Sequence, residues 1–363
     1  MSEQRRALIE LARAEAWRTY LGGALLGRLH GECGREDNHF PEEWIMSVVS
    51  ARNEGREMYM DEGMSYLGED KKRTLKELLD TEPEMFLGKE HAAVYGAQPG
   101  VLIKLIDAAE RLTIQVHPSR LKAMELFQMP FGKTECWYIL GGREIQQEKP
   151  CIYIGFKEGV SLPYWKEMFE KQDIPGMLNC LHRFEVKSGD IVLIEGGVPH
   201  AIGAGCLLAE IQEPTDYTIR VERTTPGGFA VADTMCHQGL GFERMFECFH
   251  FEGLTREEIK KRWFLSKRSV TASGEGQVNL LVGRPETSYF SMREITVSGS
   301  MRFENNTFCV LYVLEGKGVI QSNEMSLTLY KTRQIFIPFY TKDFKISAEP
   351  EMPLRILQCF GPN

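Results

Sequence analysis

The sequence lacks the features that mark membrane, secreted and nucleic-acid-binding proteins. No apolar run in its 363 residues approaches the length of a membrane span, which takes about 20 apolar residues. The N-terminus has no long apolar core followed by small residues, so a secretory signal is not expected. There is no basic block, and the net charge of −8 disfavours nucleic acid as a partner. These absences predict a cytoplasmic protein with neither membrane nor nucleic acid as a partner.

The cysteines also lack a pattern. There are nine, an odd number, scattered from Cys33 to Cys359, and none forms a C-x-x-C pair. This distribution fits reduced thiols better than a disulfide framework or a cysteine zinc site. Any bound metal is therefore expected to have nitrogen and oxygen ligands.

Helical patterns are few and do not alternate regularly with strands, so a doubly wound sheet is not expected. The stretch "MSEQRRALIELARAEAW" predicts an amphipathic helix with Leu8, Ile9 and Leu11 on its apolar side. Further helices are predicted over residues 71–86, 163–172 and 255–264. In the last of these, Thr255 is followed three residues later by Glu258, which is a capping-box pattern.

Short β-like runs broken by glycine fill much of the remaining chain. They include "VLIKLIDAA", "ECWYILGG", "CIYIGF", "GDIVLIEGG", "CLLAEIQE", "CVLYVLEGKGVI" and "RQIFIPFY". Many short strands of this kind are typical of barrels and sandwiches. Two runs have an echo, since "ECWYILGG" resembles "CVLYVLEGKG" and "GDIVLIEGGVPHAI" resembles "RQIFIPFYTKDFKI". We therefore predict a mainly β protein with two similar small barrels and additional helical segments.

The same echo predicts the domain organisation. We expect a first domain over residues 1–245, with helical insertions, and a helical connector with a second domain over residues 246–363. The second copy has no His or Glu at the echoed positions. From near Arg268 onward we therefore expect a barrel without metal that covers apolar surface of the first.

The stretch "LTIQVHPSR" ends an apolar run with Gln115 and His117. Because successive side chains of a strand point to opposite faces, these two would point the same way before Pro118 ends the strand. An isolated Q-x-H pair is most simply an exposed polar strand end. Only other residues of the chain can show whether Gln115 and His117 are an exposed strand end or part of a functional site.

Three further side chains extend this pair. Lys133 and Glu135, in "GKTECWYIL", share a face by the same alternation, and His200 follows the glycine turn of "GDIVLIEGGVPH". Two nitrogen and two oxygen donors suit a borderline divalent metal, commonly Zn²⁺, with positions left for water or substrate. A single carboxylate leaves such a site net positive, which favours a Lewis acid. We expect one ion per chain, bound by Gln115, His117, Glu135 and His200.

Four motifs in a fixed order resemble the type I phosphomannose isomerases, also called mannose-6-phosphate isomerases. The motifs are "QVHP", "GKTECWY", "GDIVLIEGGVPHA" and "EIQEPTDYTIR". The resemblance runs from near Trp17, in "AWRTYLGG", through "FPEEWIMS" to Arg220, and more loosely to the C-terminus. These enzymes are zinc-dependent members of the cupin superfamily, so the resemblance implies barrels of the double-stranded β-helix or jelly-roll type.

The resemblance assigns roles to particular positions. It implies zinc binding by the same four residues as above, and a substrate site at Lys104, Lys133, Asp216 and Arg220, and it includes Glu210 in a family motif. The chain departs from the family at Glu195, where Pro is usual, at Ile219, where Tyr is usual, and at Glu222 and Arg223, where Tyr and Asp are usual. These departures touch none of the four ligands.

The residues alone leave two interpretations for several charged side chains. Lys104, inside "VLIKLIDAA", lies either on a solvent face or buried with a partner. Arg220 and Asp216 form either a surface ion pair, or a site in which Arg220 meets a phosphate or a developing oxyanion while Asp216 holds it or handles a hydroxyl. Lys133 alone would be solvated, but its shared face with Glu135 predicts a place beside the metal.

The reaction implied by the resemblance interconverts mannose 6-phosphate and fructose 6-phosphate through an enediol. The lysines and Arg220 would anchor the phosphate, and a base would carry the carbon proton. Candidates for that base are Lys133, Asp216 and Glu210, in that order, although Glu210 equally suits the orientation of another group. The competing interpretations are an iron-dependent cupin dioxygenase, a non-catalytic sugar-phosphate-binding cupin, and an isomerase for a related sugar phosphate.

Overall fold

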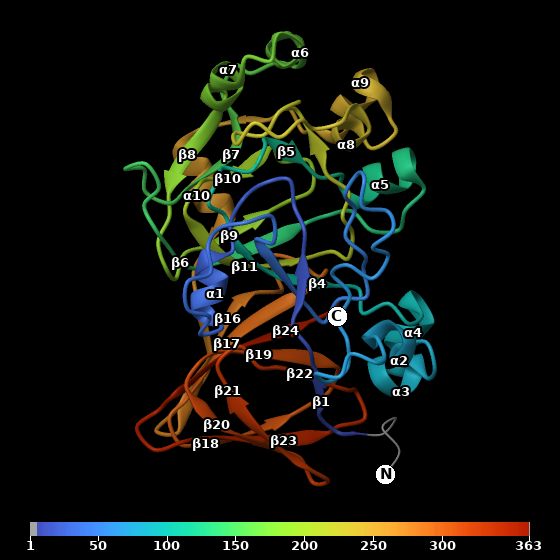
Figure 1. Cartoon of the computed structure of the whole chain (residues 1–363), viewed down its shortest axis with the longest axis vertical. Coiled ribbons are helices and arrows are strands. Elements are labelled where there is room, and N and C mark those ends of the chain that lie inside the picture. The colour runs from blue at the N-terminus through green and yellow to red at the C-terminus, as the bar shows by residue number, and fades with distance from the viewer. Residues whose placement is uncertain (1–5, 363) are drawn as a thin grey trace.

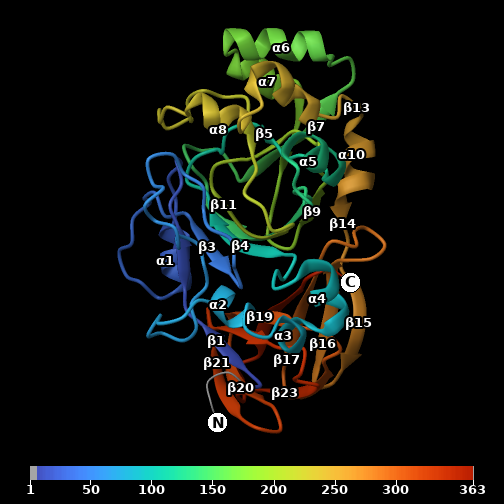
Figure 2. The same cartoon turned by 90° about the vertical axis from the view of Figure 1, so that its right-hand side faces the viewer.

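The computed structural model describes residues 6–362, which form a mainly β protein. Its strands make four sheets that follow one another along the long axis of the molecule, as Figures 1 and 2 show. All pairings within the sheets are antiparallel except that of β13 (Gly253–Leu254) with β7 (Cys151–Lys157). The predicted mainly β class is confirmed, as is the expectation that no doubly wound sheet is present among the described residues.

The sheets are named here by their position in Figure 1. The upper sheet has the strand order β12 (Ile219–Arg220), β5 (Gln115–Val116), β10 (His200–Ile202), β7 and β13, with β8 (Leu181–Glu185) also paired to β7. The central sheet has the order β14 (Phe264–Leu265), β9 (Ile191–Ile194), β6 (Glu135–Gly142), β11 (Cys206–Gln212), β4 (Leu102–Asp107), β3 (Glu42–Ile45) and β2 (Ala14–Ala16). The C-terminal sheet has the order β1 (Ile9–Leu11), β22 (Gln334–Ile337), β19 (Cys309–Glu315), β24 (Leu354–Phe360), β17 (Ser291–Val297), β16 (Gly276–Val282) and β15 (Arg268–Ser273). The lower sheet has the order β18 (Ser300–Glu304), β23 (Asp343–Ala348), β20 (Lys317–Gln321) and β21 (Ser326–Tyr330).

Short helices lie at the margins of the sheets. They are α1 (Ala24–Leu29), α2 (Leu75–Leu79), α3 (Pro83–Leu87), α4 (Lys89–Tyr95), α5 (Arg120–Phe127), α6 (Leu162–Lys171), α7 (Ile174–Asn179), α8 (Asp233–His237), α9 (Gly241–Arg244), the 3₁₀ helix η2 (Met245–Cys248) and α10 (Arg256–Trp263). None of the helices within residues 6–362 is long and apolar enough to cross a membrane.

The internal echo of the sequence has a counterpart in the strand order. The central sheet contains the run β9-β6-β11-β4, and the C-terminal sheet contains the run β22-β19-β24-β17. The echoed segments therefore take equivalent places, since β6 corresponds to β19 and β9 to β22. Two sheets with the same order of equivalent strands account for the two related halves of the sequence.

The central sheet has two faces of different character. Glu210 lies opposite Lys104 on β4 and opposite Trp137 on β6, so these three side chains point to the same face, toward the upper sheet. The neighbouring residues Leu105 and Ala209 point the other way because strand residues alternate. They belong to a single buried core with β19, β17 and β24 of the C-terminal sheet. The C-terminal sheet thus covers one apolar face of the central sheet, whereas the opposite face combines an apolar core shared with the upper sheet and buried charged residues such as Lys104 and Glu210.

The predicted N-terminal helix is wrong over the residues that the structure describes, and residues 1–5 lie outside them. Ile9–Leu11 form β1, paired with β22, and Ala14–Ala16 form β2, paired with β3. Leu8 packs in the core between the C-terminal and lower sheets, whereas Ile9 and Leu11 pack in the core toward the central sheet. Leu8, just before the strand, adds an apolar residue next to the alternating Ile9 and Leu11, and this combination imitated a helical spacing.

The helix predicted over residues 71–86 is two shorter helices. Lys71 has a φ of 49°, outside the helical region, and α2 begins only after Thr74, whose hydroxyl accepts from the backbone N–H of Glu77. Pro83 then starts α3, because proline suits the first turn of a helix and not its interior. The other two predictions are confirmed by α6 and α10, and Thr255 and Glu258 form both bonds of the predicted capping box.

All nine cysteines lie within the described residues and are free thiols, as predicted. Cys33 is exposed and the other eight are buried. Burial raises the pKa of Cys206, Cys248 and Cys309 to about 12, so these thiols stay protonated at neutral pH.

The shared core between the central and C-terminal sheets predicts a large effect of truncation there. Leu105→Ala should lower the free energy of unfolding by about 2–5 kcal/mol because it leaves a cavity in a fully buried core. Val319→Ala, on a residue that is 42% exposed, is the matched control and should change it little. Urea unfolding measures both variants, and similar values for the two would contradict a packed interface between these sheets.

Candidate active site

His117, Glu135 and His200 form a buried cluster between the upper and central sheets. His117 directly follows β5 and His200 opens β10, whereas Glu135 opens β6 on the other side. One ligand atom of each lies within 4.8 Å of the others, which is close enough to hold a metal ion. The side chains are at most 1% exposed. Three predicted ligands from distant segments therefore converge.

Backbone carbonyls hold both imidazoles by their Nδ1 atoms. The Nδ1 of His117 lies 2.9 Å from the carbonyl oxygen of Tyr217, and that of His200 lies 2.8 Å from the carbonyl oxygen of Val198. Because a carbonyl only accepts, each Nδ1 carries the proton and each Nε2 keeps a lone pair. The two Nε2 atoms lie 3.2 and 3.4 Å from the carboxylate of Glu135. Metal-binding histidines are oriented in this way.

Gln115 and Lys133 border the cluster, as the shared strand faces predicted. The amide nitrogen of Gln115 lies 3.2 Å from the Nε2 of His200. A flip of the amide places its oxygen there instead, so this side chain suits a fourth ligand. The ammonium of Lys133 donates to Glu135 and lies 2.9 Å from the Nε2 of His117.

The turn before His200 is tied to His117. Gly197 has a φ of 98°, and its N–H donates to the carbonyl oxygen of His117 over 2.7 Å. A Cβ at this position would come within 2.6 Å of the His250 ring. Both the left-handed backbone and the close approach require glycine, which fixes the two histidine segments to each other.

The protonation states suit metal binding. Burial, with the neighbouring Lys133 ammonium, lowers the pKa of His117 to about 3, and burial also lowers the pKa of His200. Burial opposes the charge on Glu135, but the Lys133 ammonium outweighs it and holds the pKa of that carboxyl well below its usual range. Two neutral imidazoles and one carboxylate are the forms that bind a divalent cation.

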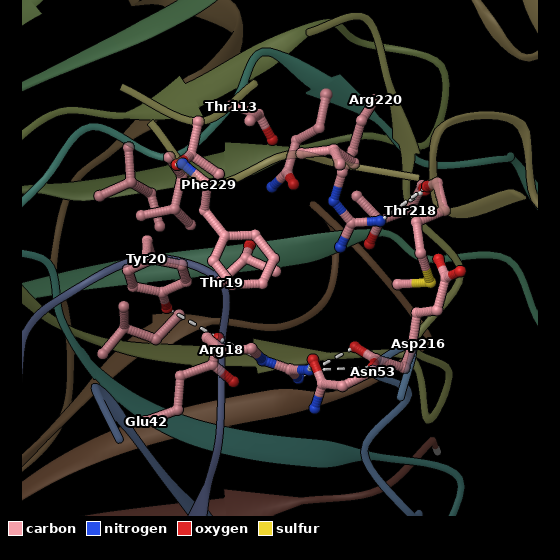
Figure 3. Close-up of a pocket in the computed structure, with 18 of the residues that line it drawn as sticks. Arg18, Thr19, Tyr20, Glu42, Asn53, Thr113, Asp216, Thr218, Arg220 and Phe229 are labelled. Carbon is pink, nitrogen blue, oxygen red and sulfur yellow. Dashed lines mark hydrogen bonds and ion pairs between the residues drawn. The ribbon is translucent and has the colours of Figure 1, made fainter. Parts of the chain in front are cut away.

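A cavity of about 370 Å³ opens beside this cluster, and Figure 3 shows part of its lining. Gln115 and Lys133 belong to its wall. The other lining residues come from the N-terminal segment, from the loop after β3, from β3, β4, β10 and β11, from the segment before β5 and from the segment after β11. The charged lining residues are Arg18, Glu42, Glu54, Lys104, Lys133, Glu210, Asp216 and Arg220. The aromatic and aliphatic lining residues include Tyr20, Ile106, Leu112, Ile202, Phe229 and Val231. The thioether of Met235 also lines the cavity.

Lys104 is buried among carboxylates, so the interpretation that places it on a solvent face is wrong. Its ammonium lies 3.7 Å from Glu42, 3.6 Å from Glu210 and 3.9 Å from Asp216. It also lies 4.7 Å from the ring centroid of Trp44. The lysine is 3% exposed, and only this ring of partners makes a buried ammonium tolerable.

The side chain of Asp216 is largely buried and pairs with Arg18 and not with Arg220, so of the two interpretations the surface ion pair is wrong. Two nitrogens of the Arg18 guanidinium lie 3.2 and 3.3 Å from the two oxygens of Asp216, and Figure 3 shows this forked contact. The backbone N–H of Arg52 donates to the same carboxylate over 3.0 Å. Burial opposes the charge on Asp216, but Arg18 and Lys104 keep its pKa well below the usual range.

Arg220 reaches the cavity without a carboxylate partner in the described part of the chain. Its Nη1 donates to the carbonyl oxygens of Thr218, over 3.1 Å, and Met235, over 3.0 Å. Burial lowers the pKa of the guanidinium from 12.5, yet it remains a cation at neutral pH. In β12 it lies opposite Gln115, whose other neighbour is His200. Arg220 therefore presents an uncompensated charge next to the metal-type cluster.

Arg18 and Glu42 are cavity residues that the sequence motifs did not reveal. The Nε of Arg18 lies 2.9 Å from the Oε1 of Glu42, which also accepts from the hydroxyl of Tyr20 over 2.7 Å. Burial opposes the charge on Glu42, but Arg18 and Lys104 lower its pKa to about 2. One feature of the sequence could have indicated Glu42: it lies two residues before Trp44 in "FPEEWIMS", so the two side chains share a strand face.

The three departures from the family pattern have structural partners of their own. The carboxylate of Glu222 is buried, pairs with Arg111, and accepts from the backbone N–H of Ile114 over 2.6 Å. Glu195 accepts from the indole N–H of Trp263, and Ile219 packs in an apolar core. The exposed Arg223 guanidinium stacks over Phe242. These replacements fasten the segments beside the site and leave its polar groups in place.

Comparison with known proteins identifies the fold class of this chain. Residues 284–353 match the cupin domain of mannose-6-phosphate isomerases, a stretch that includes strands β17 to β23 of the C-terminal and lower sheets. The mannose 6-phosphate isomerase structure from Bacillus subtilis has a TM-score of 0.73, with 24% identity over 97% of this chain and 99% of that one. A mutant of phosphomannose isomerase from Salmonella typhimurium has a TM-score of 0.72, at 14% identity over 99% of this chain and all of that one. The chain thus has the fold of these cupin-domain proteins.

The sequence relatives are consistent with this class. The mannose-6-phosphate isomerase ManA of Bacillus subtilis is 26% identical over 73% of this chain and 78% of its own length. The mannose-6-phosphate isomerase of Streptococcus mutans is 25% identical over 77% of this chain and 79% of its own length. The resemblance to the type I phosphomannose isomerases, predicted from four motifs, is confirmed.

The Arg18–Glu42 pair predicts a specific dependence of stability on pH. Folding lowers the pKa of Glu42 from 4.5 to about 2. The ionised Glu42 carboxylate therefore stabilises the folded state fully at pH values above 4.5, and this stabilisation is lost as the pH falls toward about 2. The difference in unfolding free energy between wild type and Glu42→Gln should therefore shrink on acidification across this window. Urea unfolding at a series of pH values measures it, and a difference that grows toward low pH would contradict the pairing.

Proposed function

We propose that this chain is a mannose-6-phosphate isomerase, an aldose–ketose isomerase that interconverts mannose 6-phosphate and fructose 6-phosphate in the cytoplasm. The observation that carries the proposal is the cavity of about 370 Å³, which brings four cationic side chains next to a buried His–Glu–His cluster. An anionic substrate needs such cations in a chain whose net charge is −8. Relatives that carry this enzyme's name support the same conclusion.

We further propose that His117, Glu135 and His200, together with Gln115, bind one Zn²⁺ ion. The Oε1 atom of Glu135 is buried and has no hydrogen-bond partner, which suits an oxygen reserved for a cation. Two neutral imidazoles aimed by backbone carbonyls match the ligand types that zinc prefers. When bound, the ion acts as a Lewis acid that stabilises negative charge on the substrate oxygens.

The four cationic side chains of the cavity have different proposed roles. Arg220, which is not neutralised by a carboxylate, meets negative charge on the substrate, either the phosphate or the enediolate oxygen. The pKa of Lys133 stays raised, because Glu135 outweighs the opposing effect of burial, so this lysine donates a hydrogen bond and makes a poor base. Lys104 and Arg18 are balanced by Glu42 and Asp216 and hold the far wall.

Glu210 is the base that we favour for the transfer of the carbon proton between C1 and C2. Its Oε2 accepts from the indole N–H of Trp137 over 3.0 Å, whereas its Oε1 has no hydrogen-bond partner. Burial and the charge of Glu135 raise its pKa, which moves it toward the range that suits a base near neutral pH. Asp216, in contrast, is held ionised by Arg18 and Lys104, which weakens it as a base.

The domain organisation that we propose follows the echo in the sequence. The upper and central sheets form a first cupin-like barrel in residues 1–245, and residues 246–363 contain the connector and a second, metal-free barrel. Equivalent strand order in the central and C-terminal sheets supports this division. Three strand pairings cross it, since β1 pairs with β22, β13 pairs with β7 and β14 pairs with β9.

The proposed metal site predicts the effect of removing either imidazole. Purified wild type should contain about one divalent ion per chain, and His117→Ala and His200→Ala should each lose most of it, because two ligands and Gln115 cannot complete a tetrahedral site. His91→Ala, on α4 and outside the cluster, is the control and should retain the metal. Elemental analysis decides, and full metal content in both cluster variants would refute the assignment.

Arg220→Lys tests the proposed activity and the role of the guanidinium together. Lysine keeps the charge but loses the planar two-pronged donor. If Arg220 acts mainly on the transition state, kcat for mannose 6-phosphate should fall by about two orders of magnitude with KM nearly unchanged. If it anchors the phosphate throughout, KM should rise instead.

A coupled isomerase assay measures these constants for wild type and variant. Arg223→Lys is the matched control, because Arg223 is an exposed arginine three residues away that lies outside the cavity lining. It should behave as wild type. An inactive wild-type enzyme loaded with metal would refute the proposed function, and an Arg220→Lys enzyme with unaltered kcat and KM would refute both roles of Arg220.

A further inference from the structure

Phe229 is an aromatic residue in the wall of the cavity that no sequence motif singles out. It lies in the turn between β12 and α8, and its neighbours Ala230, Val231 and Ala232 line the same wall. Figure 3 shows its ring directed into the cavity on the side of Tyr20. The residue is nevertheless 41% exposed, so the ring stands at the opening of the cavity.

Thr225 holds the turn that presents this ring. The backbone N–H of Thr225 donates to the carbonyl oxygen of Phe229 over 2.8 Å, and the N–H of Phe229 donates to the Thr225 hydroxyl over 3.0 Å. The N–H of Gly228, whose φ is 89°, donates to the Thr225 carbonyl. Thr225 is buried, so the position of the ring is defined by the fold.

Two aromatic rings from the N-terminal segment meet Phe229 at the opening. The ring centroid of Phe229 lies 5.7 Å from that of Trp17 and 6.0 Å from that of His39, both in edge-to-face geometry. Trp17 and His39 stack on each other at 5.2 Å. His39 also holds the backbone of Arg18, because the Arg18 N–H donates to the His39 carbonyl. The Phe229 ring is therefore supported by two aromatic rings of the N-terminal segment, which lie outside the cavity lining.

We propose that Phe229 is a specificity-determining residue that packs against the apolar C–H face of a hexose 6-phosphate. This assignment rests on the proposed function and adds the group that recognises the sugar. The charged groups of the cavity suit the phosphate and hydroxyls, and Phe229 is the aromatic side chain at its opening that remains accessible. Tyr20, by contrast, is buried and donates its hydroxyl to Glu42.

The proposed contact between Phe229 and the sugar predicts a change in ligand binding, which an activity assay alone would not detect. Phe229→Ala should weaken binding of mannitol 6-phosphate, which has no carbonyl and cannot isomerise, by about tenfold, the scale of losing part of a phenylalanine contact. Binding of inorganic phosphate should change by less than about twofold, because the anion touches only charged groups. Phe229→Tyr keeps the ring face and should restore the affinity for mannitol 6-phosphate.

Equilibrium dialysis of the full-length, metal-loaded protein measures both ligands. Tyr164→Ala, which removes an aromatic residue of similar exposure outside the cavity lining, should leave both affinities unchanged. Equal weakening of both ligands, or of neither, by Phe229→Ala would overturn the assignment, as would a wild type that does not bind mannitol 6-phosphate. An isomerase assay of the wild type, run in parallel, tests the proposed function separately, since selective sugar binding without turnover refutes the activity and keeps the role of Phe229.

Discussion

Strand alternation in the central sheet is the constraint on which the site depends. Each of its strands must place one set of side chains in an apolar core with the C-terminal sheet, and this fixes the opposite set, which includes Lys104 and Glu210, toward the cavity. A slip of one residue in register would exchange the two sets. The C-terminal sheet thus contributes to the cavity by holding the register of strands that belong to the central sheet.

Sequence reasoning located the groups whose geometry is local. Lys133 and Glu135 meet because they are two residues apart in an extended segment, and the glycine turn before His200 has the predicted place. It did not find Arg18, whose partner Asp216 lies 198 residues away. It also placed Asp216 in contact with Arg220 because they are four residues apart, whereas Asp216 pairs with Arg18 and Arg220 donates to the carbonyl oxygens of Thr218 and Met235. Contacts between distant segments depend on sheet topology, which a single sequence does not specify.

The remaining errors have the same origin. The N-terminal segment imitates a helix because Leu8, just before β1, packs in one core while Ile9 and Leu11 of β1 pack in another. Glu222 departs from the family pattern beside the site, and its carboxylate is engaged by Arg111 and by the N–H of Ile114. A buried carboxylate is costly without such partners, so the chain must have Arg111 if it has Glu222. Reading the two positions together would have indicated a structural role.

The pairing of β1 with β22 has a consequence for biosynthesis. Ile9 and Phe336, which are opposite each other in this pair, lie far apart in the sequence, so Ile9 leaves the ribosome long before Phe336. Until the later strand is made, the earlier one has apolar side chains and unpaired backbone groups without a partner, a state open to aggregation. Closing such a long loop is slow compared with forming local hairpins. The edge of the C-terminal sheet is therefore completed only after Phe336 has been synthesised, and a chaperone that shields β1 would act in that interval.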